Sequence, residues 1–235
     1  PAGAFSKAAA DAGMIALVFG NSDGFVRLFD GAEPFHGTNP ISVAVPSGQG
    51  NPWLLDMATS SVPFNRVGLH QSLQRDLPRG VASDSDGVDT TDPFCAEMLA
   101  PLGGSDFGFK GAALGGVAEI FSAVLTGMKL SPEIAPMAGP DFLRAREMGA
   151  FVIVMDPVAF VAAPLVEAGM TRYLALLRGS KPRAGRFVMA PGDREWARAA
   201  QRQVKGIPLD PITVTNFSQL ADEYKVKLPW PAGPS

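Results

Sequence analysis

The amino-acid sequence predicts an α/β fold, in which short strands are interleaved with helices of mixed length. Hydrophobic residues make up 46% of the 235 residues and charged residues 18%, which is the composition of a chain that folds. Short apolar runs bounded by turn residues indicate strands, and Ala-rich or amphipathic segments indicate helices. The connections are too uneven for a regular parallel series. The sequence contains no internal repeat, so we expect one continuous domain over residues 1–235.

The N-terminal part of the chain predicts one helix followed by three strands. Residues 5–13 are Ala-rich and end at Gly13, a residue typical of the position just after a helix. Three short apolar runs then predict strands at residues 14–19, 41–45 and 53–57. The loop at residues 46–52 is rich in Pro and Gly and suits a hairpin-like connection between the last two strands.

The middle of the chain predicts a surface loop and a buried helix. Residues 79–93 are polar and turn-forming, which indicates an excursion over the surface. Residues 111–128 are apolar apart from Glu119, Ser and Thr, and they approach the length of a membrane span. Their four glycines and Glu119 disfavour a membrane segment. We therefore expect the central buried helix of a globular protein.

The C-terminal part predicts further alternation of strands and helices. Strands are expected at residues 151–154 and 186–190, and helices at residues 164–178, 194–205 and 219–224. Asp193 is placed to cap the second of these helices, which ends at Gly206. Residues 228–235 are rich in Pro and are expected to be irregular.

Charge and cysteine content exclude several kinds of partner. The 20 basic and 23 acidic residues give a net charge of −3 without a block of one sign, so no nucleic-acid partner is expected. The single cysteine, Cys95, rules out an intrachain disulfide and a Cys-rich zinc site, and it fits a reducing, cytoplasmic location. The sequence opens at Pro1 without a signal-peptide pattern, which indicates a processed chain or a fragment.

The common cofactor and metal motifs do not occur in this sequence. No Gly-x-Gly-x-x-Gly follows a strand, and there is no phosphate-binding Gly-x-x-x-x-Gly-Lys-Ser/Thr loop. His36 and His70 have no metal-ligand spacing to another His, Cys or carboxylate, so no metal site is expected. The simplest interpretation of His70 is a helix-surface residue, and a structural role is also favoured for His36.

Two local patterns near the early strands could hold a ligand. In residues 37–40, a glycine and an Asn-Pro pair fix the amide of Asn39, which can donate and accept hydrogen bonds. An Asx turn is the alternative. Residues 56–61 follow a strand, and their backbone amides and hydroxyls could contact the phosphates or ribose of a nucleotide. A helix N-cap is the alternative there.

Two further patterns lie later in the chain. A glycine-rich loop at residues 103–111 delivers Lys110 to the beginning of the apolar helix, where the lysine and the helix N-terminus could meet a phosphate or carboxylate. A solvated lysine is the alternative. At residues 191–193, Pro-Gly-Asp joins a strand to a helix, and free N–H groups there can bind an anion or an adenosine hydroxyl. Capping alone would also explain this pattern.

These four patterns belong to nine stretches whose order in the chain resembles the malate/L-lactate dehydrogenase family. The stretches are residues 12–15 with 21–23, 37–41, 56–60, 86–87 with 90–93, 101–104, 109–111, 119–122 with 124–127, 191–192 and 206–208. The family includes ureidoglycolate and sulfolactate dehydrogenases, 2,3-diketo-L-gulonate reductase and piperideine-2-carboxylate reductases. The resemblance covers essentially the whole chain.

The resemblance implies a homodimeric oxidoreductase that uses NAD or NADP. It implies a non-Rossmann NAD(P)-binding fold with a mixed, largely antiparallel sheet and packed helices. Residues that match the family's dinucleotide contacts are Ser22, Asp56, Met57, Ala58, Ser60, Lys110, Gly192 and Asp193. Residues that match positions near the reacting centre are Asn39, Thr91 and Asp92.

The family's catalytic acid has no counterpart in these 235 residues. In the family, an N-terminal helical region carries a Ser-His-Gly segment, and its histidine is thought to protonate the substrate oxygen; this region would precede Pro1. Hydride delivery to a 2-oxo carbon needs such an acid, and imidazole suits the task near neutral pH. Neither His36 nor His70 matches that position. We therefore expect this chain to be the larger, cofactor-binding C-terminal part of the family's chain.

The resemblance leaves three functions open. The first is hydride transfer between nicotinamide and a 2-oxo or 2-hydroxy acid of the malate or lactate type, without a membrane partner. The second is reduction of a cyclic ketimine carboxylate with the same cofactor. The third belongs to a different class and is a noncatalytic dinucleotide-binding fragment or subunit. The choice between NAD and NADP also stays open, since no position securely identifies the surroundings of the adenosine 2′ position.

Overall fold

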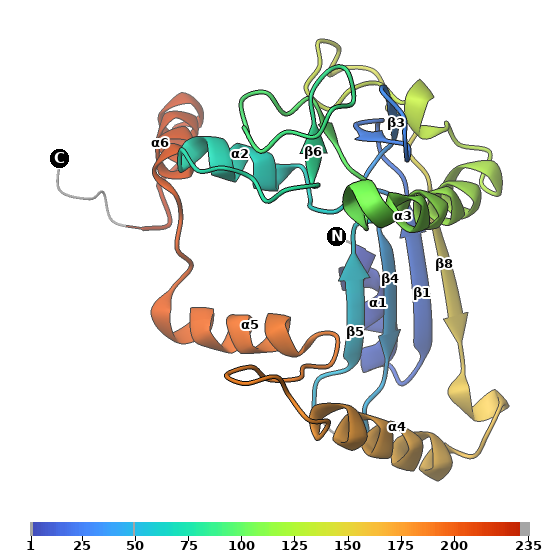
Figure 1. The fold of residues 1–235 in the computed structure, drawn as a ribbon. Coiled ribbons are helices and arrows are strands. Elements are labelled where there is room, and N and C mark those ends of the chain that lie inside the picture. Colours follow the sequence, from blue (N-terminus) through green and yellow to red (C-terminus); the bar gives the residue numbers. More distant parts are fainter. Residues whose placement is uncertain (1, 49, 231–235) are drawn as a thin grey trace.

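A computed structural model describes residues 2–48 and 50–230 and contains two four-stranded sheets and six α-helices in that part of the chain (Figure 1). The larger sheet has the strand order β5-β4-β1-β8, and every neighbouring pair is antiparallel. Its strands are β1 (Ile15–Gly20), β4 (Ile41–Val45), β5 (Trp53–Met57) and β8 (Ala150–Met155). The strands predicted at residues 14–19, 41–45, 53–57 and 151–154 are confirmed, and so is the α/β class with a largely antiparallel sheet.

Helix α1 (Ala2–Asp11) covers one face of this sheet over β1 and β4. Its buried face consists of small residues, namely Ala2, Gly3, Ser6 and Ala10. The Ser6 and Ser42 hydroxyls share a hydrogen bond of 2.6 Å. Small side chains let the helix approach the strands closely, so the predicted Ala-rich helix forms and also supports the sheet.

The smaller sheet has the order β3-β2-β7-β6 and a small apolar core beside it. Its strands are β2 (Val26–Arg27), β3 (Pro34–His36), β6 (Ala82–Ser83) and β7 (Met98–Leu99), and β2 and β7 run parallel. The core contains residues from the strands, from the intervening loops and from α2 (Asn65–Ser72): Val26, Val67, Leu77, Val81, Ala82 and Leu99. The prediction of a surface excursion at residues 79–93 holds for most of the segment and is wrong for residues 81–83, which are buried and include β6.

The apolar stretch at residues 111–128 forms part of a longer, half-exposed helix. Helix α3 (Gly104–Glu119) continues into a π-helical turn, η1 (Ile120–Val124). Its buried positions are Gly108, Gly111, Gly115, Ala118 and Glu119, whereas its large apolar side chains face outward. The prediction of a central buried helix is wrong, because only the face of α3 that carries the glycines packs against the protein and the opposite face is exposed.

One helical stretch among the described residues, Gly104–Val124, is long and apolar enough to cross a membrane by length and composition. Its glycine face is packed on folded protein. The Cβ that an alanine would add at Gly111 would lie 2.3 Å from the Leu102 nitrogen, and one at Gly115 would lie 3.0 Å from His36 Nδ1. The glycine face of this helix is thus in contact with the segment around Leu102 and with β3.

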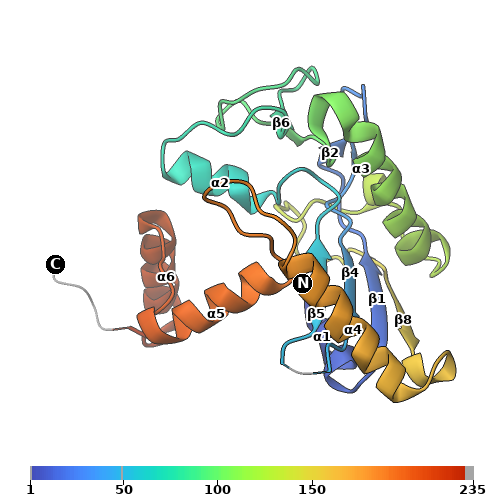
Figure 2. The same ribbon diagram turned by 60° about the horizontal axis from the view of Figure 1, so that its bottom comes forward.

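The C-terminal helices are α4 (Ala163–Arg178), α5 (Asp193–Lys205) and α6 (Pro211–Tyr224). They confirm the helices expected at residues 164–178 and 194–205, and α6 is longer than the expected 219–224 because Asp210 caps it and Pro211 occupies its first turn. Both views show α5 and α6 extending away from the two sheets (Figures 1 and 2). Two single-turn 3-10 helices, Ser131–Glu133 and Pro157–Ala159, precede and follow β8.

Residues 186–190 do not form the expected strand. The segment is irregular, Phe187 is 85% exposed, and no strand among the described residues pairs with it. Its apolar alternation resembles a strand, but a strand needs a hydrogen-bonded neighbour. At the C-terminus, residues 228–230 are irregular as expected, and residues 231–235 of the predicted irregular tail lie outside the described residues.

Candidate functional site

The end of β5 lines a pocket of about 550 Å³. This volume lies within the range of about 300–1,000 Å³ that is usual for pockets binding small molecules and cofactors. The lining residues are Ala2, Thr38, Pro40, Asp56, Met57, Ala58, Ser60, Ser61, Val62, Pro63 and Leu102. The structure therefore brings four of the predicted cofactor residues, Asp56, Met57, Ala58 and Ser60, to one cavity beside the turn at residues 37–40.

The hydroxyl groups after β5 hold the wall of this pocket in place. The Thr59 hydroxyl donates to the carbonyl oxygen of Thr38 at 3.1 Å, and the Ser60 hydroxyl donates to that of Val62 at 2.7 Å. The Ser61 hydroxyl donates to the carbonyl oxygen of Pro101 at 2.8 Å. Each hydroxyl oxygen keeps lone-pair capacity, but its proton is used inside the protein. The segment is thus a braced rim and not the helix N-cap considered as its alternative.

Asp56 is the ionisable group of the pocket wall. Burial raises the pKa of its carboxyl above the usual value, a hydrogen bond from the Gly3 backbone lowers it, and the negative charge of Glu195 raises it further. Gly3 permits this approach, because a Cβ at that position would lie 2.4 Å from the Asp56 Oδ2 atom. A partly desolvated carboxylate at a strand end is a suitable acceptor for ribose hydroxyls.

Ser22 lies directly against the turn at residues 37–40. A Cβ placed on Gly37 would fall 2.2 Å from the Ser22 Oγ atom and 2.9 Å from the Asn39 Oδ1 atom. Only glycine fits between these two side chains. Ser22, predicted at the cofactor, and Asn39, predicted near the reacting centre, are therefore brought to the same turn.

The side chain of Asn39 points into the protein. It is fully buried, and its Nδ2 donates to Glu119 Oε2 at 2.6 Å and to the carbonyl oxygen of Gly115 at 3.2 Å. Its Oδ1 lies 3.3 Å from the Ser131 hydroxyl, whose proton has Glu119 Oε2 as a closer acceptor at 2.6 Å. The flanking residues Thr38 and Pro40 are the ones that reach the pocket. The predicted role of Asn39 near the reacting centre stays a prediction, and the geometry favours action through the turn.

Lys110 does not lie in a loop at the mouth of the helix, as the sequence suggested. Helix α3 begins at Gly104, so Lys110 is inside the helix, where its Nζ lies 5.1 Å from the ring centre of Phe107 and 5.8 Å from that of Phe109. Gly103 and Gly104 both have positive φ angles and start the helix early. Lys110 does not line the pocket, whereas Leu102, whose carbonyl oxygen accepts from the Gly111 N–H, does.

The junction of residues 191–193 lies beside the other end of β5. The Leu54 N–H donates to the carbonyl oxygen of Pro191 at 3.2 Å. Gly192, with φ of 95°, is the N-cap residue of α5, so the expectation that Asp193 is the cap is wrong by one position. The carboxylate of Asp193 instead accepts from the Ala190 N–H at 2.9 Å and from Arg178 at 2.7 and 3.0 Å. This ion pair lowers the pKa of Asp193.

Thr91 and Asp92 lie in a loop beside α2 and do not line the pocket. The Thr91 carbonyl oxygen accepts from the Leu77 N–H at 2.7 Å, and Asp92 Oδ1 accepts from the Phe94 N–H at 2.9 Å. The side chain of Asp92 also accepts a weak bond from the Cys95 thiol, which raises the pKa of that thiol. Their predicted place near the substrate is untested by this geometry.

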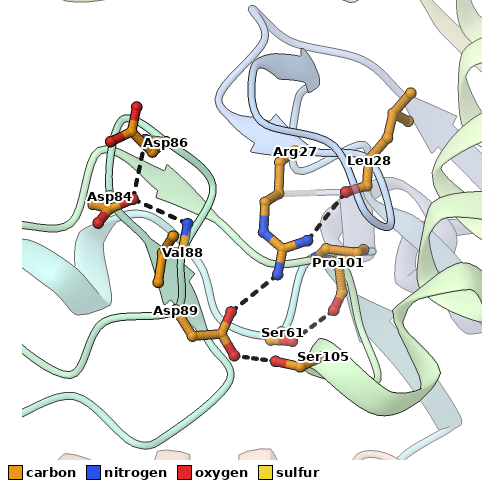
Figure 3. A network of polar contacts seen from close by, with 9 residues as sticks. All are labelled: Arg27, Leu28, Ser61, Asp84, Asp86, Val88, Asp89, Pro101 and Ser105. Carbon is orange, nitrogen blue, oxygen red and sulfur yellow. Dashed lines mark hydrogen bonds and ion pairs between the residues drawn. The ribbon is translucent and has the colours of Figure 1, made fainter.

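A polar network joins the turn at residues 84–89 to the beginning of α3 (Figure 3). Arg27, which is 5% exposed, pairs with Asp89 at 3.0 Å, and the other carboxylate oxygen of Asp89 accepts from the Ser105 hydroxyl. Asp84 accepts from the backbone N–H groups of Asp86 and Val88. Ser61 belongs both to this region and to the pocket at the end of β5. The network thus fixes α3 next to the pocket rim.

Neither histidine lies in the pocket. His36 is 7% exposed in β3; burial lowers its pKa, and the charge of Glu119 partly opposes this effect. His70 lies on α2, and its Nδ1 shares a hydrogen bond of 2.8 Å with the carbonyl oxygen of Asp76. Among residues 2–48 and 50–230, no group of three or more His, Cys, Asp or Glu side chains could hold a metal ion. Both histidines thus have structural surroundings.

Sequence reasoning missed the carboxylate behind the pocket. In the sequence, Glu119 is the one charged side chain of an apolar stretch, and the structure buries it among Asn21, Asn39 and Ser131. An acid alone in an apolar helix is the signal that could have found it, because such a group is buried only where donors surround it. Its partners come from distant segments and could not be named beforehand.

The described residues form an α/β fold with an antiparallel larger sheet and a pocket at the end of β5. The sequence profile of the malate/L-lactate dehydrogenase family matches residues 1–218, and the chain belongs to this family. It is similar to the malate dehydrogenase structure from Entamoeba histolytica, with a TM-score of 0.87 and 26% identity over 97% of this chain and 66% of that one.

Two sequence relatives illustrate the chemistry named within the family. Ureidoglycolate dehydrogenase (NAD(+)) of Escherichia coli K12 is 32% identical over 207 residues, which are 87% of this chain and 58% of the relative. Delta(1)-pyrroline-2-carboxylate reductase of Agrobacterium fabrum is 28% identical over 217 residues, which are 90% of this chain and 59% of the relative. The chain thus spans about 58–66% of the lengths of these three proteins.

Proposed function

We propose that this chain is the dinucleotide-binding part of an NAD(P)-dependent oxidoreductase that transfers a hydride between nicotinamide and a 2-oxo or 2-hydroxy acid. The observation that carries the proposal is the pocket at the end of β5, in which Asp56, Met57, Ala58 and Ser60 meet the turn at residues 37–40. Family membership supports the same conclusion.

The residues of the pocket fit a dinucleotide. Asp56 offers carboxylate oxygens to ribose hydroxyls, and Ala58 leaves room for a flat group at the rim. Met57 and Val62 supply apolar surface. When bound, the dinucleotide would supply the hydride chemistry, and this chain would supply position, exclusion of water and charge. Gly192 and Asp193, beside Leu54 at the opposite end of the same strand, are proposed to contact the adenosine end.

The substrate is proposed to be a small acid with a 2-oxo or 2-hydroxy group. The names of the relatives favour this class, and a pyrroline-2-carboxylate reductase among them supports a cyclic ketimine carboxylate as the second candidate. The acid that protonates the substrate oxygen is proposed to lie outside these 235 residues, because His36 and His70 are both engaged away from the pocket. A homodimer and a cytoplasmic location are proposed on the same family likeness and on the lone Cys95.

The substrate class is tested by assaying NADH and NADPH oxidation by the full-length protein with pyruvate, oxaloacetate and piperideine-2-carboxylate side by side. Turnover of the 2-oxo acids is expected, and preference for the cyclic ketimine would select the second candidate. The same assay on the 235-residue chain alone is expected to show dinucleotide binding with little turnover. Robust turnover by that chain would overturn the proposal that the acid lies elsewhere.

A further inference from the structure

We infer that Glu119 is a positioning residue, which holds the turn at residues 37–40 in the shape that the dinucleotide pocket requires. The inference rests on the proposed function, because the pocket concerned is the proposed dinucleotide pocket. Glu119 does not line the pocket, so any effect on a bound ligand must act through other residues. The role of Glu119 follows from its hydrogen bond to Asn39 and from the position of Thr38 and Pro40, the neighbours of Asn39, in the pocket wall.

Glu119 is a buried carboxylate that accepts four hydrogen bonds. It is 6% exposed. Its Oε2 accepts from Asn39 Nδ2 and from the Ser131 hydroxyl, both at 2.6 Å, and its Oε1 accepts from the Ser131 N–H at 2.5 Å and from Asn21 Nδ2 at 3.4 Å. No lysine or arginine of residues 2–48 and 50–230 forms a salt bridge with it. Neutral donors alone therefore compensate its burial.

The donors come from three segments that are far apart in the sequence. Asn21 directly follows β1 and directly precedes Ser22, Asn39 belongs to the turn, and Ser131 follows η1. Asn21 extends the contact, because its Nδ2 also donates to the carbonyl oxygen of Lys129 and its Oδ1 accepts from the Gly149 N–H, both at 2.8 Å. The Glu119 carboxylate thus ties the end of α3 to the end of β1, to the turn at residues 37–40 and to the segment that follows η1.

The turn needs such support because of its backbone. Asn39 has a φ of 34°, in the left-handed region, which asparagine adopts more readily than other non-glycine residues, aided by hydrogen bonds of its side chain. Such a conformation persists when the surrounding structure over-determines it. Glu119 and Gly115 accept both amide hydrogens of Asn39, and its Oδ1 lies 3.3 Å from the Ser131 hydroxyl, whose single proton has Glu119 Oε2 as its closer acceptor. The side chain is thereby locked, and the backbone follows.

The pocket lies immediately in front of this locked residue. Thr38 and Pro40 flank Asn39 and line the pocket. The Thr38 carbonyl oxygen accepts from the Thr59 N–H at 2.8 Å and from the Thr59 hydroxyl at 3.1 Å, which joins the turn to the end of β5. A shift of Asn39 would therefore move both walls of the pocket. The path from Glu119 to the pocket needs only one intervening residue.

The test compares Glu119→Gln with Glu133→Gln in the full-length protein. Gln at 119 presents an N–H₂ group where two of the four donors now point, so one side of the network is lost. Calorimetric titration is expected to show at least about a tenfold rise in the Kd for NADH or NADPH, since small misplacements of a binding group are costly. Glu133 is exposed, lies in the 3-10 helix that begins at Ser131 and, among the described residues, accepts one hydrogen bond, from the Leu130 N–H, so its variant should stay within about twofold.

Two further readouts separate positioning from mere stability. Asp210→Ala removes the N-cap of α6, a helix that contributes no residue to the pocket, and should lower the melting temperature without changing the Kd. In a double-mutant cycle, Glu119→Gln should have no added effect on the Kd once Asn39→Ala is present, because both changes release the same turn. Additive losses, or a Kd that follows melting temperature across all variants, would overturn the inference.

Hydrogen–deuterium exchange provides a measurement that does not depend on the cofactor. Glu119→Gln is expected to speed exchange at residues 37–41 and 131–134 while β8 stays protected, and unchanged exchange at the turn would overturn the inference. Ser131→Ala, which removes one donor and keeps the carboxylate, should show the same pattern more weakly and serves if Glu119→Gln does not fold. A wild-type protein that binds neither dinucleotide would defeat the proposed function, and the exchange data would still decide on the turn.

Discussion

Lys110 illustrates how far a single side chain can depart from its expected setting. The sequence placed it in a glycine-rich loop, and the structure places it in α3 beside two exposed aromatic rings. A lysine between Phe107 and Phe109 keeps its charge in water, and the rings restrict where that charge can be. Lys110 does not line the pocket, so its contact with the cofactor stays a prediction.

Lys110→Met is expected to raise the Kd for NADH or NADPH about tenfold. The change keeps the stem of the side chain and would remove the charge-assisted hydrogen bond predicted between Lys110 and a phosphate, a type of bond that contributes roughly 1.5–3 kcal/mol. Fluorescence titration at two salt concentrations measures the effect, which should shrink at high salt. Lys181→Met, in an exposed loop after α4, is the matched control. An unchanged Kd would remove Lys110 from the cofactor site.

At the residue scale, the residues of the pocket rim could be predicted from the sequence, whereas the buried hydrogen-bond partners of Asn39 could not. Asp56, Met57, Ala58 and Ser60 follow a strand that is easy to recognise, so local pattern was enough to bring them together. The environment of Asn39 was not predictable. Its partners Glu119 and Ser131 are distant in sequence, and only the folded chain determines which donors meet a buried acid.

At the scale of single elements, the close packing of helix α3 against its neighbours depends on its buried glycines. A Cβ at Gly111 would lie 2.3 Å from the nitrogen and 2.4 Å from the carbonyl oxygen of Leu102, and backbone cannot move aside as a flexible side chain can. A Cβ at Gly116, in the same helix, would meet nothing within 4 Å. Packing therefore requires a glycine at position 111 and does not require one at position 116.

Gly111→Ala is expected to lower the free energy of unfolding by about 1–3 kcal/mol through overpacking. Gly116→Ala is its matched control and should raise that free energy by about 0.5–1 kcal/mol, because alanine is the better helix former. Urea denaturation followed by circular dichroism measures both. A loss of stability of equal size in both variants would contradict the packing of α3 described above.

The N-terminus of α6 provides a pH-dependent contact between elements. Hydrogen bonds from the Thr213 side chain and backbone, and then from the Ser72 hydroxyl of α2, lower the pKa of Asp210 to about 2. A carboxyl group with a lowered folded-state pKa stabilises the fold fully above its usual value of 3.8, and this contribution is lost as the pH falls toward 2. The contact therefore operates throughout the neutral range.

Asp210→Ala is expected to lower the melting temperature at pH 6 by more than at pH 3. The cap and the bond to Ser72 are lost at both pH values, but near pH 3 part of the wild-type advantage is already titrated away. Thermal melts of both proteins at pH 6, 4 and 3 measure the difference. A difference that grows toward pH 3 would show that the ionised form of Asp210 is not the stabilising one.

Strands were predictable where an apolar run in the sequence also has a neighbouring strand to pair with in the fold. The strands β1, β4, β5 and β8 have continuous apolar runs and find each other in one antiparallel sheet. Residues 186–190 have a similar pattern without a neighbouring strand, and Arg178 and Ala190 instead bind Asp193. Two-residue strands such as β6 and β7 have no sequence signal, since tertiary pairing alone creates them.

At the scale of the whole molecule, family membership and fold agree. The order of nine short stretches indicated the family before the structure, and the profile match over residues 1–218 confirms it. The largely antiparallel sheet explains why no Rossmann fingerprint occurs, because there is no strand-glycine-helix unit of that kind at the pocket. The relation between the two sheets and the pocket could not be derived from strand positions alone.

The central claim is that the pocket at the end of β5 holds the dinucleotide. Ala58 lines this pocket, so Ala58→Trp would fill it, whereas Ala145→Trp adds the same side chain to an exposed loop. Calorimetric titration of both variants and the wild type with NADH and NADPH tests the claim most directly. We expect saturable binding by the wild type and by Ala145→Trp, and at least about a hundredfold weaker binding by Ala58→Trp with its fold intact. Equal affinity in all three proteins would place the dinucleotide elsewhere and contradict the claim.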